Sequence, residues 1–202
     1  MAEFNLEQFK IDVANGKRKD LYYFYKRSEV VKQTNAADTK ELADYFLKSF
    51  NTPVYLMYGT LIGALREKDF IPFDHDIDVA YLSTKHAKQD VLEEFSLICD
   101  TLYKQGLLSK QCSNGHIHVW SPNKHLKIDL WTSWTEENKL FLVPYFEGAI
   151  NANLLIPLKH LTFRSLDFLC PANSDKFLDC IYKSWRTPKT DSWHKLSWKK
   201  FL

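Results

Sequence analysis

Apolar side chains in the first quarter of the chain recur at a spacing that predicts helix. Over residues 1–50 these positions follow a loose helical period, which becomes regular towards the end of the segment, where Asp38 or Thr39 can act as an N-cap. Pro53 should end the helix, because a proline disfavours helical geometry in the residue before it. We therefore expect residues 1–52 to form an N-terminal helical segment packed on a core.

Shorter apolar segments after Pro53 predict strands that alternate with helices. Strands are expected over residues 54–58, 76–82, 107–112, 116–121, 126–132 and 139–145, with further short strands within 151–157 and 160–168. Helices are expected over residues 60–67, from the favourable N-cap Ser83 to Gln105, and after Ser174. This mixture of elements predicts an α+β fold.

Composition narrows the class of protein. The chain has 202 residues, 45% of them apolar, which suffices for one ordinary core and argues against disorder. A net charge of +2 is too small to predict specific nucleic-acid binding, which usually requires a strongly basic patch. Aromatic residues make up 15% of the chain, which suits a site for sugars, bases or a quaternary ammonium group.

The two ends of the chain bear on its location. The N-terminus lacks the basic and apolar regions of a signal peptide, and no stretch approaches the roughly 18 to 20 apolar residues of a membrane-spanning helix. We therefore expect a cytoplasmic protein. The tail over residues 189–202 is basic and aromatic, and it could make a peripheral contact with a membrane surface.

The spacing of cysteine and histidine residues gives only weak evidence for a metal site. The four cysteines lie far apart without a C-x-x-C pair, so we expect them to be reduced and predict no structural zinc held by clustered cysteines. His116 and His118 alternate on one face of a predicted strand, together with Trp120. Two such histidines could bind a transition metal. Because we identify no third soft ligand near them in the sequence, a substrate-facing or surface role is preferred.

The stretch from Tyr58 to Tyr81 carries the strongest chemical signal. Asp76 and Asp78 are separated by one isoleucine and would share a face of a strand. Neighbouring carboxylates repel each other unless a cation lies between them, and Mg²⁺ is typically held by one or two carboxylates plus substrate phosphates. An isolated D-x-D is more often a solvated turn, but here a small-residue turn at residues 59–60 precedes it after an apolar run. The pattern predicts a metal-dependent phosphoryl-type transfer centre.

The segment G-T-L-I-G-A-L-R-E-K-D-F-I-P-F-D-H-D-I-D, which begins at Gly59, resembles the signature of the LicD/fukutin-related family. The matching positions are Gly59, Thr60, Leu61, Gly63, Arg66, Ile71, Pro72, Asp74, Asp76, Ile77 and Asp78. Phe73 and His75 stand where the family usually has Trp and Asp, and alternation along a strand would turn His75 away from the metal. The resemblance covers residues 53–188 and implies a nucleotidyltransferase-like mixed sheet flanked by helices.

The family resemblance also implies an activity. Its members move a phospho-alcohol, such as phosphocholine or ribitol phosphate, from a CDP-linked donor to a glycan or glycolipid acceptor. Asp76, Asp78 and a third carboxylate would then hold Mg²⁺ (or Mn²⁺). Asp129 is the expected third carboxylate and general base, since it lies on the polar face of the strand over 126–132. Asp74 is expected to orient the turn or a bound water.

The resemblance assigns phosphate-binding roles to residues near the carboxylates. Gly59 and Thr60 would hold a phosphate through backbone amides and a hydroxyl. Arg66 is the candidate for a bidentate phosphate contact. The alternative for Arg66 is a salt bridge with Glu67 or Asp69 on the helix surface.

The sequence leaves open two other functions and the role of one further element. The same carboxylates would serve a nucleotidyltransferase that adds a nucleotide to a small molecule, protein or RNA. A catalytically inactive domain that binds a glycan or a partner is the second alternative. The element formed by Tyr182, Trp185 and Pro188 is similar to the family's closing motif, and it either frames a pocket or only packs the domain.

Overall fold

A computed structural model describes residues 24, 27–72, 74–142, 146–182 and 184–188. The predictions for residues 1–23 and for the tail over 189–202 concern parts of the chain outside these residues. Within the described part, no helix combines the length and the apolar character needed to cross a membrane.

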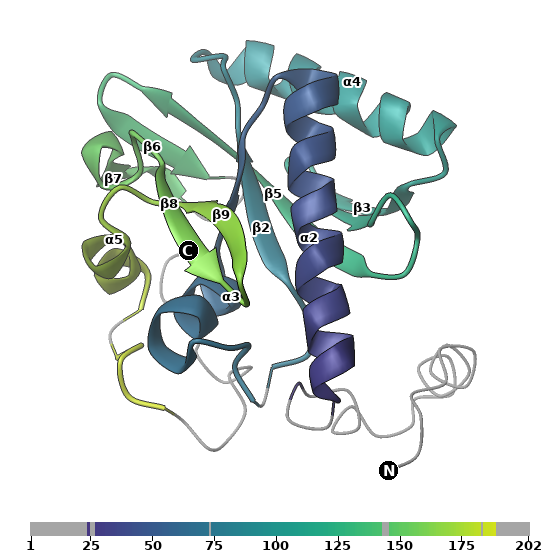
Figure 1. Cartoon of the computed structure of the whole chain (residues 1–202). Coiled ribbons are helices and arrows are strands. Elements are labelled where there is room, and N and C mark those ends of the chain that lie inside the picture. Colours follow the sequence, from purple (N-terminus) through teal and green to yellow (C-terminus); the bar gives the residue numbers. More distant parts are fainter. Residues whose placement is uncertain (1–23, 25–26, 73, 143–145, 183, 189–202) are drawn as a thin grey trace.

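The centre of the fold is a nine-stranded mixed sheet (Figure 1). Its main path runs in the order β3-β4-β5-β2-β1-β9-β8, and β6 continues from β5 and pairs with β7. The strands are β1 (Val54–Leu56), β2 (Asp78–Leu82), β3 (Leu108–Ser113), β4 (His116–Trp120), β5 (Lys127–Glu136), β6 (Lys139–Leu142), β7 (Phe146–Asn151), β8 (Lys159–Phe163) and β9 (Leu166–Cys170). The central strand β2 pairs antiparallel with β1 and parallel with β5, which makes the sheet mixed.

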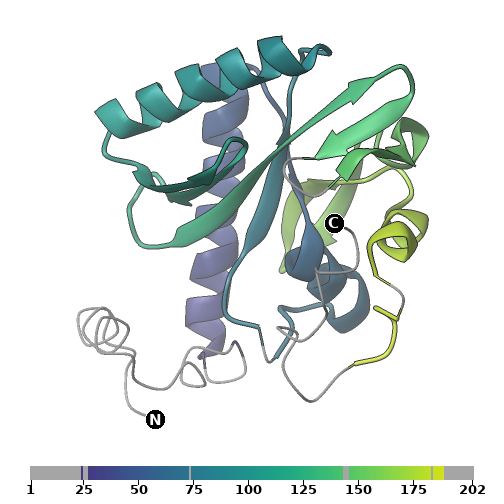
Figure 2. The same cartoon turned by 180° about the vertical axis from the view of Figure 1, so that it is seen from behind.

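Helices flank the sheet and close its ends. The elements are α2 (Glu29–Phe50), α3 (Tyr58–Ile62) with a π-helical turn (Gly63–Glu67), α4 (Lys88–Lys104), a 3-10 turn (Ala152–Leu154) and α5 (Ser174–Ile181). Helix α2 runs in front of the sheet in Figure 1 and behind it in Figure 2, and it packs against β1 and β9. Helix α4 packs against β3, and α3 packs against β2 and α5. The predicted α+β class, with a mixed sheet and an N-terminal helix, is confirmed.

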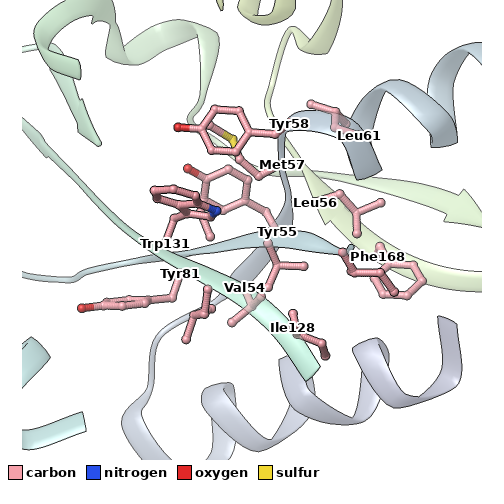
Figure 3. Packing of buried hydrophobic residues seen from close by; sticks show 14 of the residues in the cluster. Val54, Tyr55, Leu56, Met57, Tyr58, Leu61, Tyr81, Ile128, Trp131 and Phe168 are labelled. Atoms are coloured by element: carbon pink, nitrogen blue, oxygen red, sulfur yellow. The ribbon is translucent and has the colours of Figure 1, made fainter. Parts of the chain in front are cut away.

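The two faces of the central strands have different neighbours. Val54 and Ile128 point towards the pale-purple helix α2 in Figure 3, whereas Tyr58 and Trp131 lie on the other side of the strands. All four side chains are buried. Because side chains alternate along a strand, the residue after Ile128 points to the same side as Trp131. That side carries the chemistry described below.

Two predicted helix starts are wrong. Helix α2 begins at Glu29, where Ser28 Oγ accepts a hydrogen bond from the Val31 amide at 3.3 Å. Asp38 and Thr39 therefore lie buried in the middle of one continuous helix, since no proline or glycine interrupts it. Helix α4 begins at Lys88 rather than at Ser83, whose backbone N–H extends the sheet by donating to a carbonyl of β5 at 2.8 Å.

The segment after β6 also differs from the prediction. The expected strand over residues 151–157 is instead the end of β7 followed by the 3-10 turn. Asn151 explains the change, because its side chain accepts a hydrogen bond from the Asn153 amide at 2.8 Å and so favours a turn. The hairpin of β8 and β9 and the final helix form as expected.

Candidate active site

Two aspartates occupy paired positions on neighbouring parallel strands. Asp78 is the first residue of β2, and its register partner on β5 is Asp129. The Asp129 amide donates to the carbonyl of Ile77 at 2.9 Å, which fixes this register. Register partners on adjacent strands point to the same face of a sheet, so the side chains of Asp78 and Asp129 both lie on the face opposite α2. Two of the three predicted carboxylates are therefore neighbours, although they lie far apart in the sequence.

Gly59 lies where three segments of the site meet. It belongs to the first turn of α3, directly after β1. A Cβ atom added at Gly59 would overlap Asp74 Oδ2 and would lie 3.7 Å from Asp78 Oδ2. The missing side chain thus makes room for the carboxylate of Asp74, which explains the need for glycine here. The sharp turn expected at residues 59–60 is made by Tyr58, whose φ of 43° is left-handed.

Asp76 lies beside this pair, but not on the strand. Strand β2 begins at Asp78, so the prediction of a strand over 76–82 is wrong for its first two residues. The alternation argument fails for His75 as well. Its Nδ1 lies 3.7 Å from Asp74 Oδ1 and 3.9 Å from Asp76 Oδ1, so the ring faces the carboxylates instead of turning away. The physical reason is that residues 74–77 form a loop without a two-residue repeat.

The carboxylates perturb one another strongly. Burial raises the pKa of Asp78 well above its usual range, and the charges of Asp76, Asp129 and Asp74 raise this pKa further. Burial and the charge of Asp74 raise the pKa of Asp76 in the same way. The pKa of Asp74 is lowered, because hydrogen bonds with His75 and Asp76 outweigh the effect of burial. Such a cluster binds either protons or a cation.

Arg27 supplies a positive charge that the sequence did not reveal. Its guanidinium donates a hydrogen bond to the carbonyl oxygen of His75 at 2.7 Å and lies 4.2 Å from the centre of the Phe24 ring. Burial lowers the pKa of Arg27 to about 10, against the charges of Asp74 and Asp76, so the side chain is cationic at neutral pH. The residue is 48 positions away from its hydrogen-bond partner, and no local motif marks it.

Two histidines on β4 face the carboxylate of Asp129. The Nε2 atom of His118 lies 3.3 Å from Asp129 Oδ1, and that of His116 lies 3.6 Å from Asp129 Oδ2. The ring of His116 also stacks on Trp131, with centroids 3.6 Å apart. Trp131 in turn donates from Nε1 to Asp78 Oδ1 at 3.1 Å. The predicted common face of the histidine pair is confirmed by the pairing of β4 with β5.

Thr60 and Arg66 have partners within the protein. Thr60 is 3% exposed, and its Oγ1 accepts a hydrogen bond from the Asp78 amide at 2.9 Å, which ties α3 to β2. Arg66 donates from Nε to Glu67 Oε1 at 2.6 Å and from a terminal nitrogen to the Trp185 carbonyl. The salt bridge considered for Arg66 therefore forms. Phosphate contacts for both residues remain predictions.

The C-terminal element reaches the same site. Burial and the charges of Asp78, Asp74 and Asp76 raise the pKa of Tyr182 well above its usual range, which places the phenol near the carboxylates. Trp185 is buried and donates from Nε1 to Asp179 Oδ1 at 2.9 Å. The element therefore does both of the things considered for it, since Trp185 packs the domain and Tyr182 borders the site.

Potential metal ligands gather at two places in the described part of the chain. Asp74, His75 and Asp76 offer ligand atoms within 4.8 Å of one another, and so do Cys112, His116 and His118. The predicted set of Asp76, Asp78 and Asp129 does not form so tight a group. The charges of Asp76, Asp129 and Asp74 nevertheless all act on Asp78. Carboxylate oxygens are the ligands that Mg²⁺ prefers, so the chemistry of the donor set fits this ion.

Buried like charges distinguish this site. A hollow of about 740 Å³ lies elsewhere, between the end of α2 and α4, where its lining includes Phe50, Asp90 and Leu97. It contains none of the carboxylates described above. We therefore place the candidate active site at the start of β2 and β5, where buried like charges converge.

Comparison with known proteins relates this chain to a family and to a bacterial protein. The sequence model described as LicD/FKTN/FKRP, nucleotidyltransferase domain, matches residues 51–173. An uncharacterized protein of Rickettsia prowazekii (strain Madrid E) is 24% identical over 158 residues, which cover 78% of this chain and 54% of that relative. The chain thus spans about half the length of the curated relative it matches. Because the family match extends over more than half of the chain, this protein belongs to the LicD/FKTN/FKRP family and carries its nucleotidyltransferase domain.

Proposed function

We propose that this protein transfers a phospho-alcohol from a CDP-linked donor to a hydroxyl group of a cell-surface glycan. Membership of the family points to a transferase. The observation that carries the proposal is the pairing of Asp78 with Asp129 on parallel strands, with Asp74 and Asp76 adjoining them. Buried carboxylates that raise one another's pKa are suited to hold a cation bound to a diphosphate.

Mg²⁺, or Mn²⁺ in its place, is the ion we propose for this site. Asp76, Asp78 and Asp129 would hold it, and Asp74 would orient the loop around it. When bound, the ion supplies positive charge that offsets the charge of the donor phosphates. The strong upward shifts in the pKa values of Asp76 and Asp78 support this proposal, since a cation would relieve the repulsion that causes part of them.

The chain's own residues account for the remaining requirements of the reaction. The acceptor oxygen attacks the phosphorus of the phospho-alcohol, the bond from that phosphorus to the bridging oxygen breaks, and CMP leaves. Asp129 accepts the proton of the attacking hydroxyl, and His116 and His118 hold its carboxylate in place from β4. Arg27 and Arg66 would bind the diphosphate of the donor. Each already donates a hydrogen bond to a backbone carbonyl oxygen, that of His75 and that of Trp185.

A panel of donors tests the proposal. The protein is incubated with Mg²⁺ and CDP-choline, CDP-ribitol or CDP-glycerol, with and without candidate glycans, and CMP release is measured. We expect release from one donor, stimulated by an acceptor, and its loss in Asp78→Asn and Asp129→Asn. His160→Asn is a matched control, because His160 is an exposed residue of β8 that pairs with Asp167.

The other outcomes separate the alternative functions. Turnover of nucleoside triphosphates with failure of every CDP donor would identify a nucleotidyltransferase instead. Failure of both donor classes, with glycan binding that is unchanged in Asp78→Asn, would indicate an inactive binding domain.

A further inference from the structure

A second group of potential metal ligands lies on the sheet face next to the carboxylates. Cys112 on β3 and both histidines of β4 have ligand atoms within 4.8 Å of one another. The group comprises one thiol and two imidazoles, whereas the carboxylate site consists mainly of oxygen ligands. Its members follow the spacing C-x-x-x-H-x-H, and Cys112 thus supplies a third soft ligand beside the two histidines.

The local structure explains how Cys112 reaches the histidines. Strands β3 and β4 form an antiparallel hairpin, and their register shifts between Gln111 and Ser113, so Cys112 lies at an irregularity. In the register that pairs Lys110 with His118, regular alternation places Cys112 on the histidines' face, opposite His116. A backbone hydrogen bond from His118 also reaches Cys112. Three ligands are thus held by a single short hairpin.

We propose that Cys112, His116 and His118 form a binding site for Zn²⁺ or a similar soft divalent cation. Thiolate and imidazole are the ligands that zinc and its neighbours in the transition series prefer, and Mg²⁺ does not compete for them. The carboxylate of Asp129 lies 3.3 Å from His118 Nε2 and 3.6 Å from His116 Nε2, so it can orient the rings.

Packing is compatible with this site, since His118 lies against the carboxylate of Asp129. Stacking on Trp131 fixes the ring of His116 before any ion arrives. Two of the three ligands are therefore held in place by the sheet.

Cobalt provides a direct probe. The protein is stripped with a chelator and titrated with Co²⁺ alone, and the absorption spectrum is recorded. We expect one equivalent to bind with a thiolate-to-cobalt charge-transfer band, and Zn²⁺ to abolish the band by displacement, while excess Mg²⁺ leaves it unchanged. In Cys112→Ser the band should disappear, and the affinity for Zn²⁺ should fall at least about tenfold. In His118→Gln the affinity should fall by a similar factor.

Cys180→Ser is the matched control, because Cys180 is also an exposed, free cysteine but lies on α5. It should bind Co²⁺ with the same band as the unaltered protein. Circular dichroism of each variant shows whether it is folded, and the exposed position of Cys112 makes its change to serine mild. The proposal is overturned if Co²⁺ binds without a thiolate band, or if Cys112→Ser binds Co²⁺ and Zn²⁺ as tightly as the unaltered protein.

Discussion

The indole of Trp131 donates a hydrogen bond to the carboxylate of Asp78 at 3.1 Å. The same indole stacks on His116 and meets the ring of Tyr58 edge-on, with centroids 5.3 Å apart. Trp131 therefore joins a carboxylate of the candidate active site to the histidine hairpin. A hydrogen bond to a buried carboxylate favours its ionised form, so this contact opposes the upward pKa shift of Asp78.

Trp131→Phe should lower activity more than it lowers stability. The variant keeps an aromatic ring but removes the donor, so the pKa of Asp78 should rise further and the carboxylate should bind a cation less well. We expect kcat/KM to fall about 10- to 100-fold, as for other residues that orient a metal ligand, and the free energy of unfolding to fall by about 1–2 kcal/mol. CMP release at several Mg²⁺ concentrations measures the effect, which should shrink as Mg²⁺ rises.

Trp120→Phe is the control for this change. Trp120 lies on the same face of the sheet, but its register partner is Lys127, beyond the carboxylates. It should leave the dependence on Mg²⁺ unaltered. An equal loss in both variants, or full activity in Trp131→Phe, would show that the hydrogen bond to Asp78 has no functional role.

Asp78→Asn should stabilise the protein in the absence of divalent cations. Asparagine keeps the oxygen that accepts from Trp131 but removes the charge that Asp76 and Asp129 repel. Because the folded-state pKa of Asp78 is raised, the folded protein binds more protons, so its stability falls as pH rises from 3.8 through that pKa. The advantage of the variant should therefore be absent at acid pH and grow towards neutral pH.

Thermal unfolding with and without Mg²⁺ measures this effect. Each kcal/mol gained should raise Tm by about 2–4 °C for a chain of this size. Mg²⁺ should raise the Tm of the unaltered protein more than that of Asp78→Asn, because a ligand that binds only the folded state stabilises it. If Asp78→Asn is less stable at every pH, mutual repulsion does not dominate the site.

Replacing Gly59 and Gly63 by alanine should affect activity and stability differently. In Gly59→Ala the new Cβ meets a carboxylate oxygen of Asp74, at the end of a side chain that can move. In Gly63→Ala it meets the backbone oxygen of Asp69 at 2.6 Å and the Ile71 amide nitrogen at 3.1 Å, which cannot move independently. We expect Gly59→Ala to fold with a loss of about 1 kcal/mol yet to lose most activity.

Gly63→Ala should instead lose about 2–4 kcal/mol of stability, because backbone overlap forces the loop away from the helix. Chemical denaturation and CMP release on both variants make the comparison. Similar losses of stability in the two proteins would contradict the role assigned to the carboxylate beside Gly59.

Features that depend on a local sequence pattern could be predicted, whereas those that depend on contacts between distant residues could not. Asp129 could be placed on the polar face of its strand because side chains alternate over a long regular segment, and β5 forms as expected. Its proximity to Asp78 depends on a parallel pairing that no local pattern encodes. The position of His75 could not be obtained by alternation, because the strand begins three residues later.

Long-range contacts and strand pairing explain why two residues near the site could not be predicted from the sequence. Arg27 reaches the site from before α2, and its contact is a matter of chain packing. Cys112 stands four residues before His116, so its spacing was visible in the sequence. Its position opposite His116 depends on the register in which β3 pairs with β4, which no local pattern encodes.

The members of a charge network at the first turn of α2 should contribute unequally to stability. Asp69 pairs with Lys32 at 2.8 Å and with Arg164, whose side chains are only 13% and 10% exposed, whereas Glu29, which also pairs with Arg164, is 73% exposed. Asp69→Asn removes the less exposed of the two carboxylates that pair with these largely buried cations and should cost about 1–2 kcal/mol. Glu29→Gln should cost well under 1 kcal/mol, because solvent screens an exposed pair.

The pH dependence of the Glu29→Gln variant tests this interpretation. Hydrogen bonds from Arg164 and Lys32 lower the pKa of Glu29 from 4.5 to about 2. The stabilisation is therefore fully present above pH 4.5 and lost as the pH falls towards 2. Denaturation curves at intervals across this range should show the small difference between the unaltered protein and Glu29→Gln vanish on acidification. A difference that persists at pH 2, or a cost for Asp69→Asn no larger than that for Glu29→Gln, would mean that ionic pairing does not account for the stability of this corner.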